Sequence, residues 1–434
     1  MKVYTQELFI TKKELDLKGL SSLRECYNLC IRHKLPQQHR VIRFVITKTN
    51  KDGYYSELDI ILPDKNEEAA LFPKDSSIFD FRKRTHENTD GFNAVLLIPT
   101  GIGAEIGGHC GDGNAVARLL ASACDTLVTH PNVVNASDIN EMTSNTLYVE
   151  GSILTRLLNG QIGLQNVKSN RLLMLMDKHE ERLFNNEVIN AVSSARVTLG
   201  LDCDVHEMKN IIESVSHYSK SGRAVGEINS LEKIFQVVEK HKNDYDAVAL
   251  STFIRVPKYF HEKYFKDSDM VNAWGGIEAM LTHSIAEIFN IPCAHSPMMT
   301  SKEVMNTDLG IVDPRKAPET SSVTYLHCIL KGLHRAPRIV PFDKGLTLED
   351  ISCVIIPDGC IGLPVLACLT NNIPVIAVKE NKNNMQNNLE NLPFKKDRLF
   401  IVNNYLEAAG VMNSLKAGVS PESVRRPIKH TIQI

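Results

Sequence analysis

Short apolar runs alternate with helical periodicity over most of the chain. Strands are predicted at 93–98, 125–130, 171–177, 246–254, 291–297, 352–357 and 373–381, and amphipathic helices at 114–123, 187–200, 230–241, 275–290 and 363–372. Strands that alternate with helices are typical of parallel sheets covered by helices on both faces. The predicted fold class is therefore α/β. Because this region is long for one sheet, we expect two Rossmann-like lobes with a cleft between them.

The first residues follow another pattern. A strand is predicted at 2–10, a helix at 20–33, and a hairpin at 41–62 that turns at the Asp-Gly of Asp52 and Gly53. We expect a small α+β unit at 1–65, a polar linker at 66–91, the α/β body at 92–418 and a tail at 419–434. The loop at 219–226 is predicted to open the helix at 230–241.

Composition narrows the class of protein. The 434 residues are 43% hydrophobic and 23% charged, and the formal net charge is −2, so no strong field attracts nucleic acid or an anionic membrane. We find neither a cleavable leader nor an apolar run long enough to span a bilayer. The ten cysteines do not have the spacing of metal ligands, and we expect them to be reduced thiols. We expect a cytoplasmic protein that binds neither nucleic acid nor membrane.

A glycine-rich loop joins the strand at 93–98 to the helix at 114–123. Six glycines between 101 and 113 are expected to expose backbone amides at a helix N-terminus, a position that favours the binding of an anion. The spacing fits neither the dinucleotide fingerprint nor the P-loop. Close packing of helix and strand is the alternative explanation. Candidate ligand-binding residues here are Gly101, Gly103, Gly107, Gly108 and Asp112.

Two later loops share this composition. Ser221, Gly222 and Arg223 offer a hydroxyl, bare backbone and a guanidinium, and we take them as further ligand-binding candidates, although surface charge is an equal alternative. The third loop spans 358–362. Cys110 could be a nucleophile at a helix N-terminus, but a small side chain that fills a loop is the better interpretation.

Polar side chains gather where strands should end. His130 and Glu150 are candidate acid–base residues in the segment 129–151, and Asn132 and Asn135 are candidate ligand-binding residues there, with ordinary turn chemistry as the alternative. Glu278 and His283 on one helix, and His295 on the next strand, complete the candidate catalytic set. No spacing specifies three metal ligands, so no metal site is predicted. We expect at least one of His283 and His295 to line the same pocket as Gly107 and His130.

Several motifs occur together in one order: PTGIGAEIGG, THPNVVNAS with YVEG, SGRAVG, GGIEAMLTHS with IPCAHSP, and YLHCILKGLHRAPRIV. On these motifs, residues 92–418 resemble the family catalogued as domain of unknown function 3326. The resemblance implies an intracellular α/β protein of unassigned activity. Most of the candidate residues match its pattern, whereas His109 and Cys110 depart from it, and the N-terminal unit has no counterpart.

Two functions remain open at this point. The first is an enzyme, of unassigned reaction class and cofactor, that acts on a small phosphorylated or carboxylated metabolite by His/Glu acid–base chemistry. The second is a regulatory protein that binds a nucleotide or metabolite without turnover. A homodimer is the expected assembly. We find no coiled-coil heptads or long charged tail that would indicate a purely structural role.

Overall fold

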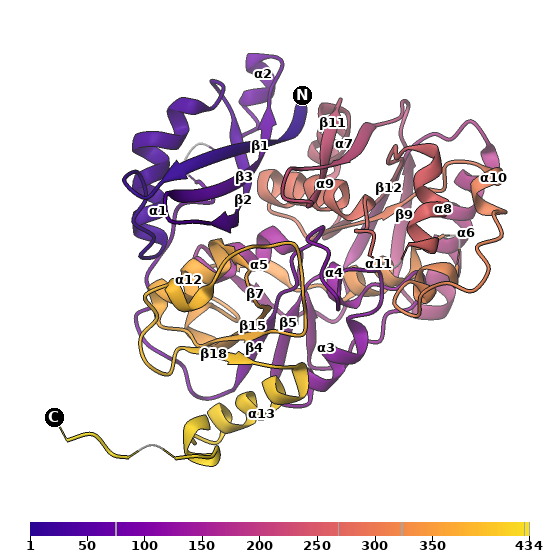
Figure 1. Cartoon of the computed structure of the whole chain (residues 1–434). Coiled ribbons are helices and arrows are strands. Elements are labelled where there is room, and N and C mark those ends of the chain that lie inside the picture. Colours follow the sequence, from indigo (N-terminus) through magenta and orange to yellow (C-terminus); the bar gives the residue numbers. More distant parts are fainter. Residues whose placement is uncertain (74–75, 268, 323, 429, 434) are drawn as a thin grey trace.

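The computed structural model describes residues 1–73, 76–267, 269–322, 324–428 and 430–433. Residues 74–75 of the predicted linker, 268 and 323 of the predicted body, and 429 and 434 of the predicted tail lie outside it. The fold is mixed α/β, with two parallel sheets, a mainly antiparallel sheet and a short two-stranded one (Figure 1). In the described part of the chain, no helix is both long enough and apolar enough to cross a membrane.

A six-stranded parallel sheet forms one half of the molecule. Its order is β18-β17-β15-β4-β5-β6, and its strands are β4 (Asn93–Leu96), β5 (Thr126–Thr129), β6 (Thr146–Tyr148), β15 (Ile351–Pro357), β17 (Val375–Val378) and β18 (Leu399–Val402). Central residues such as Val95, Leu127 and Ile355 are fully buried because helices cover both faces. Strand β18 and helix α13 (Tyr405–Lys416), near the C-terminus, return to this half, which is why purple and yellow segments lie together there in Figure 1.

A four-stranded parallel sheet forms the other half. Its order is β13-β12-β8-β9, with β8 (Arg171–Met176), β9 (Asp202–Glu207), β12 (Ala247–Thr252) and β13 (Cys293–Pro297). The principal helices of the whole chain are α1 (Leu20–Cys26), α3 (Asn114–Ala121), α5 (Gly151–Leu158), α6 (Arg182–Leu199), α7 (Glu232–His241), α8 (Lys258–Lys266), α9 (Trp274–Phe289), α11 (His327–His334), α12 (Leu363–Asn371) and α13 (Tyr405–Lys416). Short helices α2 (Asn66–Ala69), α4 (Pro131–Val134) and α10 (Lys302–Met305) complete the set.

The N-terminal strands do not form a sheet of their own. The third sheet has the order β10-β11-β1-β3-β2-β16 and combines β1 (Lys2–Thr11), β2 (Arg40–Thr49) and β3 (Gly53–Leu62) with β10 (Glu213–Tyr218), β11 (Ala224–Asn229) and β16 (Ile361–Gly362). The predicted hairpin of β2 and β3 is confirmed, and Asn50 Oδ1 accepts hydrogen bonds from the amides of Asp52 and Gly53 in its turn. In the fourth sheet β7 (Ile162–Gln165) pairs with β14 (Arg338–Pro341).

One predicted element is wrong. The loop at 219–226 does not open a helix, because residues 224–229 form strand β11, which pairs antiparallel with both β10 and β1. Residues 219–223 are thus the turn of a hairpin, and α7 begins only at Glu232. The part of the predicted linker that the structure describes includes α2 and places Ile78 and Phe79 in the core.

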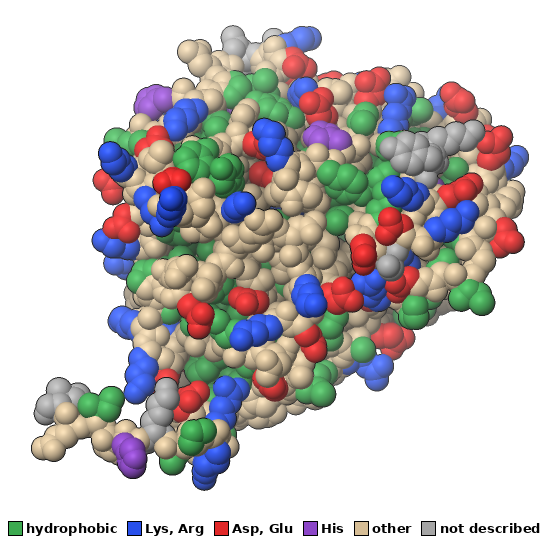
Figure 2. Space-filling model, in the orientation of Figure 1, with side chains coloured by type: hydrophobic (Ala, Val, Ile, Leu, Met, Phe, Trp, Pro, Cys, Tyr) green, Lys and Arg blue, Asp and Glu red, His purple; other side chains and the backbone are tan. Residues whose placement is uncertain are grey.

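Charged side chains of both signs are interspersed on the surface. On the face shown in Figure 2, Lys and Arg alternate with Asp and Glu around a central area of mostly uncharged atoms. This distribution agrees with the near-zero net charge of the sequence.

Candidate functional site

A cavity of about 180 Å³ lies where the three larger sheets meet. Three of its lining residues follow successive strands of the six-stranded sheet: Thr100 follows β4, His130 follows β5 and Glu150 follows β6. The strands are parallel, so their carboxyl ends meet at one edge, and the loops that leave them surround a common space. The remaining walls come from β2, β13 and helices α5, α9 and α12.

Glu150 and His283 lie in direct contact in this cavity. Glu150 Oε1 lies 2.7 Å from His283 Nδ1, while Oε2 accepts the amides of Ser152 and Ile153 and so caps helix α5. Burial by itself would raise the pKa of Glu150, but the charge of His283 and these hydrogen bonds outweigh it and lower the pKa to about 2. Glu150 is therefore a fixed negative charge that orients the imidazole.

The other ring nitrogen of His283 remains available. No hydrogen bond to Nε2 is found in the described part of the chain, and the ring lines the cavity. Gly151 permits this position, since a Cβ there would lie only 3.1 Å from His283 Cε1. A carboxylate at Nδ1 and a free Nε2 is the arrangement that lets histidine exchange a proton with a bound molecule.

His130 offers different chemistry. Burial lowers its pKa to about 4, so the imidazole is neutral near pH 7. Nε2 lies 3.1 Å from the amide nitrogen of Ile98 and accepts its hydrogen bond. The ring proton is consequently on Nδ1, which makes His130 a hydrogen-bond donor rather than a base.

His295 and Glu278 line the cavity from the side of β13 and α9. His295 Nε2 lies 3.0 Å from Thr252 Oγ1. Its Nδ1 is buried, lies 3.6 Å from a Glu278 carboxylate oxygen and makes no hydrogen bond within the described part of the chain. All five candidate catalytic residues thus line one cavity. His130, His283 and His295 line this cavity together, as expected. Gly107 does not line it; the glycines of the loop that do are Gly101 and Gly108.

The glycine loop directs several amides to groups of the protein itself. The amide of Gly107 donates to Asp112 (2.8 Å), that of Cys110 to Glu319 (2.7 Å) and that of Ile106 to Asn381 (2.9 Å). Burial raises the pKa of Asp112 to about 8 and that of Glu319 to about 7. Gly103, Gly107 and Asp112 do not line the cavity. The amides of this part of the loop therefore donate to side chains of the protein itself, where we expected them to donate to a bound anion.

The two candidate asparagines line the cavity and also support its walls. Asn132 donates to the carbonyls of Ile98 (3.0 Å) and Gly107 (2.7 Å), which holds the glycine loop against the end of β4. Asn135 Oδ1 accepts from Tyr148. Cys110 also lines the cavity, but burial raises its thiol pKa well above the usual value, which disfavours a nucleophilic thiolate at neutral pH.

The candidates Ser221, Gly222 and Arg223 lie outside the cavity lining. Arg223 is 1% exposed, and its guanidinium pairs with Glu57 (2.6 Å) and Asp59 (3.2 Å) on β3. Ser221 donates to the same Glu57. The pairing of β11 with the N-terminal sheet brings these groups together, so Arg223 is committed to carboxylates of its own chain.

Sequence reasoning missed Arg43. This residue lies on β2 and lines the cavity opposite the strand ends. Its Nη2 donates to the carbonyl of Thr100 (3.1 Å), while Nη1 is buried and has no hydrogen-bond partner among the residues that the structure describes. No sequence signal marks it, because a single arginine in a strand is ordinary and only the packing of sheets brings it to the cavity.

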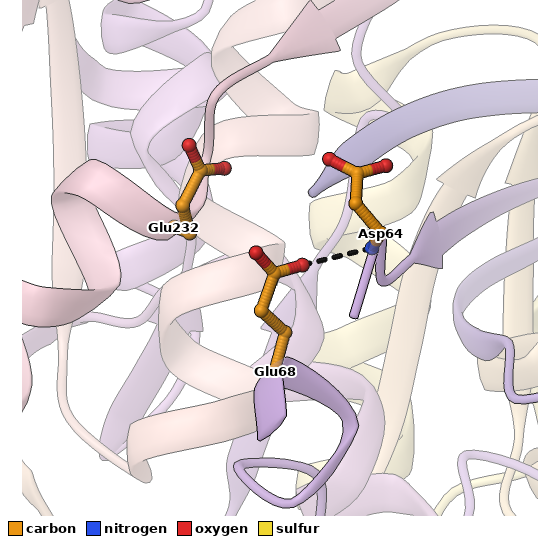
Figure 3. A group of neighbouring side chains, drawn as sticks. All are labelled: Asp64, Glu68 and Glu232. Atoms are coloured by element: carbon orange, nitrogen blue, oxygen red, sulfur yellow. Dashed lines mark hydrogen bonds between the residues drawn. The ribbon is translucent and has the colours of Figure 1, made fainter. Parts of the chain in front are cut away.

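A separate acidic cluster lies away from the cavity lining. Carboxylate oxygens of Asp64, Glu68 and Glu232 lie within 4.8 Å of one another, and Figure 3 shows them converging from three segments. All three form ion pairs with the amino group of Met1. It is the single group of three potential metal ligands found in the described residues, and the ammonium group balances part of its charge.

Comparison with known proteins covers most of the chain. Residues 93–425 match the model of a family described as "Protein of unknown function (DUF3326)". The chain belongs to this family. It is also similar to an uncharacterized lipoprotein of Synechococcus sp., with 32% identity over 342 residues, covering 76% of this chain and 92% of the relative. No solved structure matches the chain.

The DUF3326 segment contains most of the cavity but not all of it. Thr100, His130, Glu150, His283 and His295 lie within it. Residues 42–45 of β2, including Arg43, come from the part of the chain that precedes it. The cavity of this DUF3326 protein is therefore completed by an N-terminal strand outside the family match.

Proposed function

We propose that this protein is an enzyme that acts on a small anionic metabolite in the cavity by acid–base chemistry. The observation that carries the proposal is the Glu150–His283 pair, which presents a free imidazole nitrogen beside the neutral donor His130. His283 would take or give a proton at Nε2. His130 Nδ1–H would stabilise negative charge that develops on a substrate oxygen, and its low pKa keeps it neutral for that role.

Glu278 and His295 form the second titratable pair of the proposal. Glu278 lies on α9, as His283 does, and His295 lies on the neighbouring strand β13; the buried Nδ1 of His295 has no hydrogen-bond partner among the described residues. Such a pair can return the proton that His283 removes, so two acid–base groups would act on one substrate. The reaction class, whether hydrolase, lyase, isomerase or transferase, and any cofactor stay open.

We further propose that the protein is cytoplasmic and has two Rossmann-like lobes, with the ligand bound in a cleft between them. Two parallel sheets with helical cover support the lobes, and the cavity contacts elements of both. Ten free thiols support a reducing compartment. Small metabolites or nucleotides, rather than nucleic acid or membrane, are the expected partners, and a homodimer is the expected assembly.

The test combines binding with turnover. A thermal-shift screen of carboxylic acids, phosphorylated metabolites and nucleotides identifies ligands, since a ligand at 100 times its Kd adds about 2.7 kcal/mol of stability. Ligands that bind are then incubated with the protein in D2O, and NMR detects a new product or deuterium at carbon. We expect His283→Asn to abolish turnover and His217→Asn, on the exposed face of β10, to leave it unchanged.

Two outcomes contradict this mechanism. Full turnover by His283→Asn would exclude His283 as the acid–base residue. Ligand binding without turnover by the unaltered protein would instead support the regulatory alternative, in which the cavity senses a metabolite or nucleotide.

A further inference from the structure

Arg43 lies beside an irregularity in β2. The register with β3 shifts between Val41, which is opposite Ile60, and Arg43, which is opposite Asp59. A bulge adds a residue to one strand and re-aims the side chains around it. Residues 42–45 all line the cavity, so this part of β2 runs along the cavity wall.

The charge of Arg43 is incompletely matched by the protein. Its carboxylate neighbour Asp59 has Oδ2 at 3.9 Å from Nη1, beyond hydrogen-bond distance, while the other oxygen, Oδ1, accepts bonds from Thr5 and Arg223. Burial, followed by repulsion from Arg223, lowers the pKa of Arg43 to about 10, which still leaves it charged at neutral pH. A buried cation with an unused donor is stabilised by a bound anion.

The N-terminus of helix α12 lies beside the backbone of β2 close to Arg43. Strand β16 pairs antiparallel with β2, with Gly362 opposite Val45, so the helix that begins at Leu363 starts next to Phe44 and Arg43. Residues 362–365 line the same cavity. The first-turn amides of a helix have no partner within the helix and carry its positive dipole end. Because Pro364 has no amide hydrogen, the first turn of α12 contributes the amides of Leu363 and Val365 at the cavity that Arg43 also lines.

We propose that Arg43 and the first turn of α12 bind the carboxylate of the substrate, whose apolar part packs on the apolar residues around them. This inference rests on the proposed function and names its substrate class as a small monocarboxylate. The apolar walls here are Ile42, Phe44, Val45, Leu363 and Val365.

Charge counting favours one carboxylate over a phosphate dianion. Among the described lining residues, Arg156 is the only other Lys or Arg, and its guanidinium already bonds the side chain of Asn290 and the carbonyl of Ala286. Arg43, with its unused Nη1 donor, then balances one negative charge, and the lining carboxylates Glu150 and Glu278 disfavour a second one. The specificity for substrate would then reside in a strand that the family match does not include.

The experiment uses the full chain and three probes: pentanoate, its neutral analogue pentanamide, and inorganic phosphate. Binding is measured by ligand-observed NMR titration for the wild type, Arg43→Gln, Arg43→Lys and Lys48→Gln, the last removing an exposed charge from the same strand. We expect the wild type to bind pentanoate at least tenfold more tightly than pentanamide or phosphate. Arg43→Gln should lose that preference, Arg43→Lys should keep part of it, and Lys48→Gln should behave as wild type.

Thermal unfolding checks that Arg43→Gln is folded, which we expect because Asp59 keeps Thr5 and Arg223 as partners. Equal affinity for pentanoate and pentanamide, tighter binding of phosphate, or no effect of Arg43→Gln on pentanoate would overturn the inference. So would absence of pentanoate binding to the wild type. The proposed function fails on a different result, full turnover by His283→Asn, so the two failures are distinguishable.

Discussion

Replacing Glu150 with glutamine should destabilise the protein in a pH-dependent way. The folded-state pKa of about 2, compared with the ordinary 4.5, means that ionised Glu150 stabilises the fold. At 1.36 kcal/mol per pKa unit, this contribution is about 3 kcal/mol at pH 7. Glutamine keeps an oxygen for the amides of Ser152 and Ile153 but loses the charge that pairs with His283.

The sign of the pH dependence follows from the lowered pKa. A carboxyl group whose pKa is depressed on folding stabilises fully above its unfolded pKa and loses that stabilisation as the pH falls through the folded value. With unfolded and folded values of 4.5 and about 2, the wild type should lose about 1 kcal/mol by pH 4 and about 2 kcal/mol by pH 3 from this group. The gap between wild type and Glu150→Gln should narrow accordingly.

Urea unfolding at pH 7, 4 and 3 measures this gap, and fluorescence of Trp274, the single tryptophan, reports on unfolding. Glu213→Gln, which alters an exposed carboxylate on β10, is the control and should match wild type at each pH. A gap that stays constant from pH 7 to pH 3, or equal stability of Glu150→Gln and wild type at pH 7, would refute the reasoning.

Three further outcomes follow from packing and burial. Gly108→Ala should reduce stability by about 3 kcal/mol or more in urea unfolding, because its Cβ would lie 1.9 Å from the carbonyl oxygen of Ala104. A Gly108→Ala variant as stable as the wild type would show that the loop can move to accept the methyl group. Arg223→Met should cost about 3–5 kcal/mol in the same assay, since it leaves buried Glu57 without its cation; a more stable variant would contradict this. Cys110 should react with iodoacetamide at pH 7.5 much more slowly than a small thiol does, because burial raises its pKa; rapid labelling, located by mass spectrometry, would contradict burial.

Local patterns determined much of this fold. Alternation of apolar strands with amphipathic helices predicts the parallel sheets, and the Asp-Gly of Asp52 and Gly53 predicts the hairpin of β2 and β3, because both signals depend on residues close in sequence. The convergence of His130 and Glu150 was also predictable. His130 follows a predicted strand and Glu150 belongs to the polar segment expected at the same edge of the sheet, whereas strand β6, which places Glu150 there, appears only in the structure.

Tertiary pairing decided what the patterns could not. Residues 224–229 became a strand because the edge of β1 was available to pair with them, a partner more than two hundred residues away. The same pairing committed Arg223 to Glu57 and Asp59, and so removed it from the ligand site. Arg43 became a cavity residue only through the packing of β2 against the strand ends. Sequence spacing carries no information on such contacts, since the free energy that selects them comes from burial and charge pairing between distant segments.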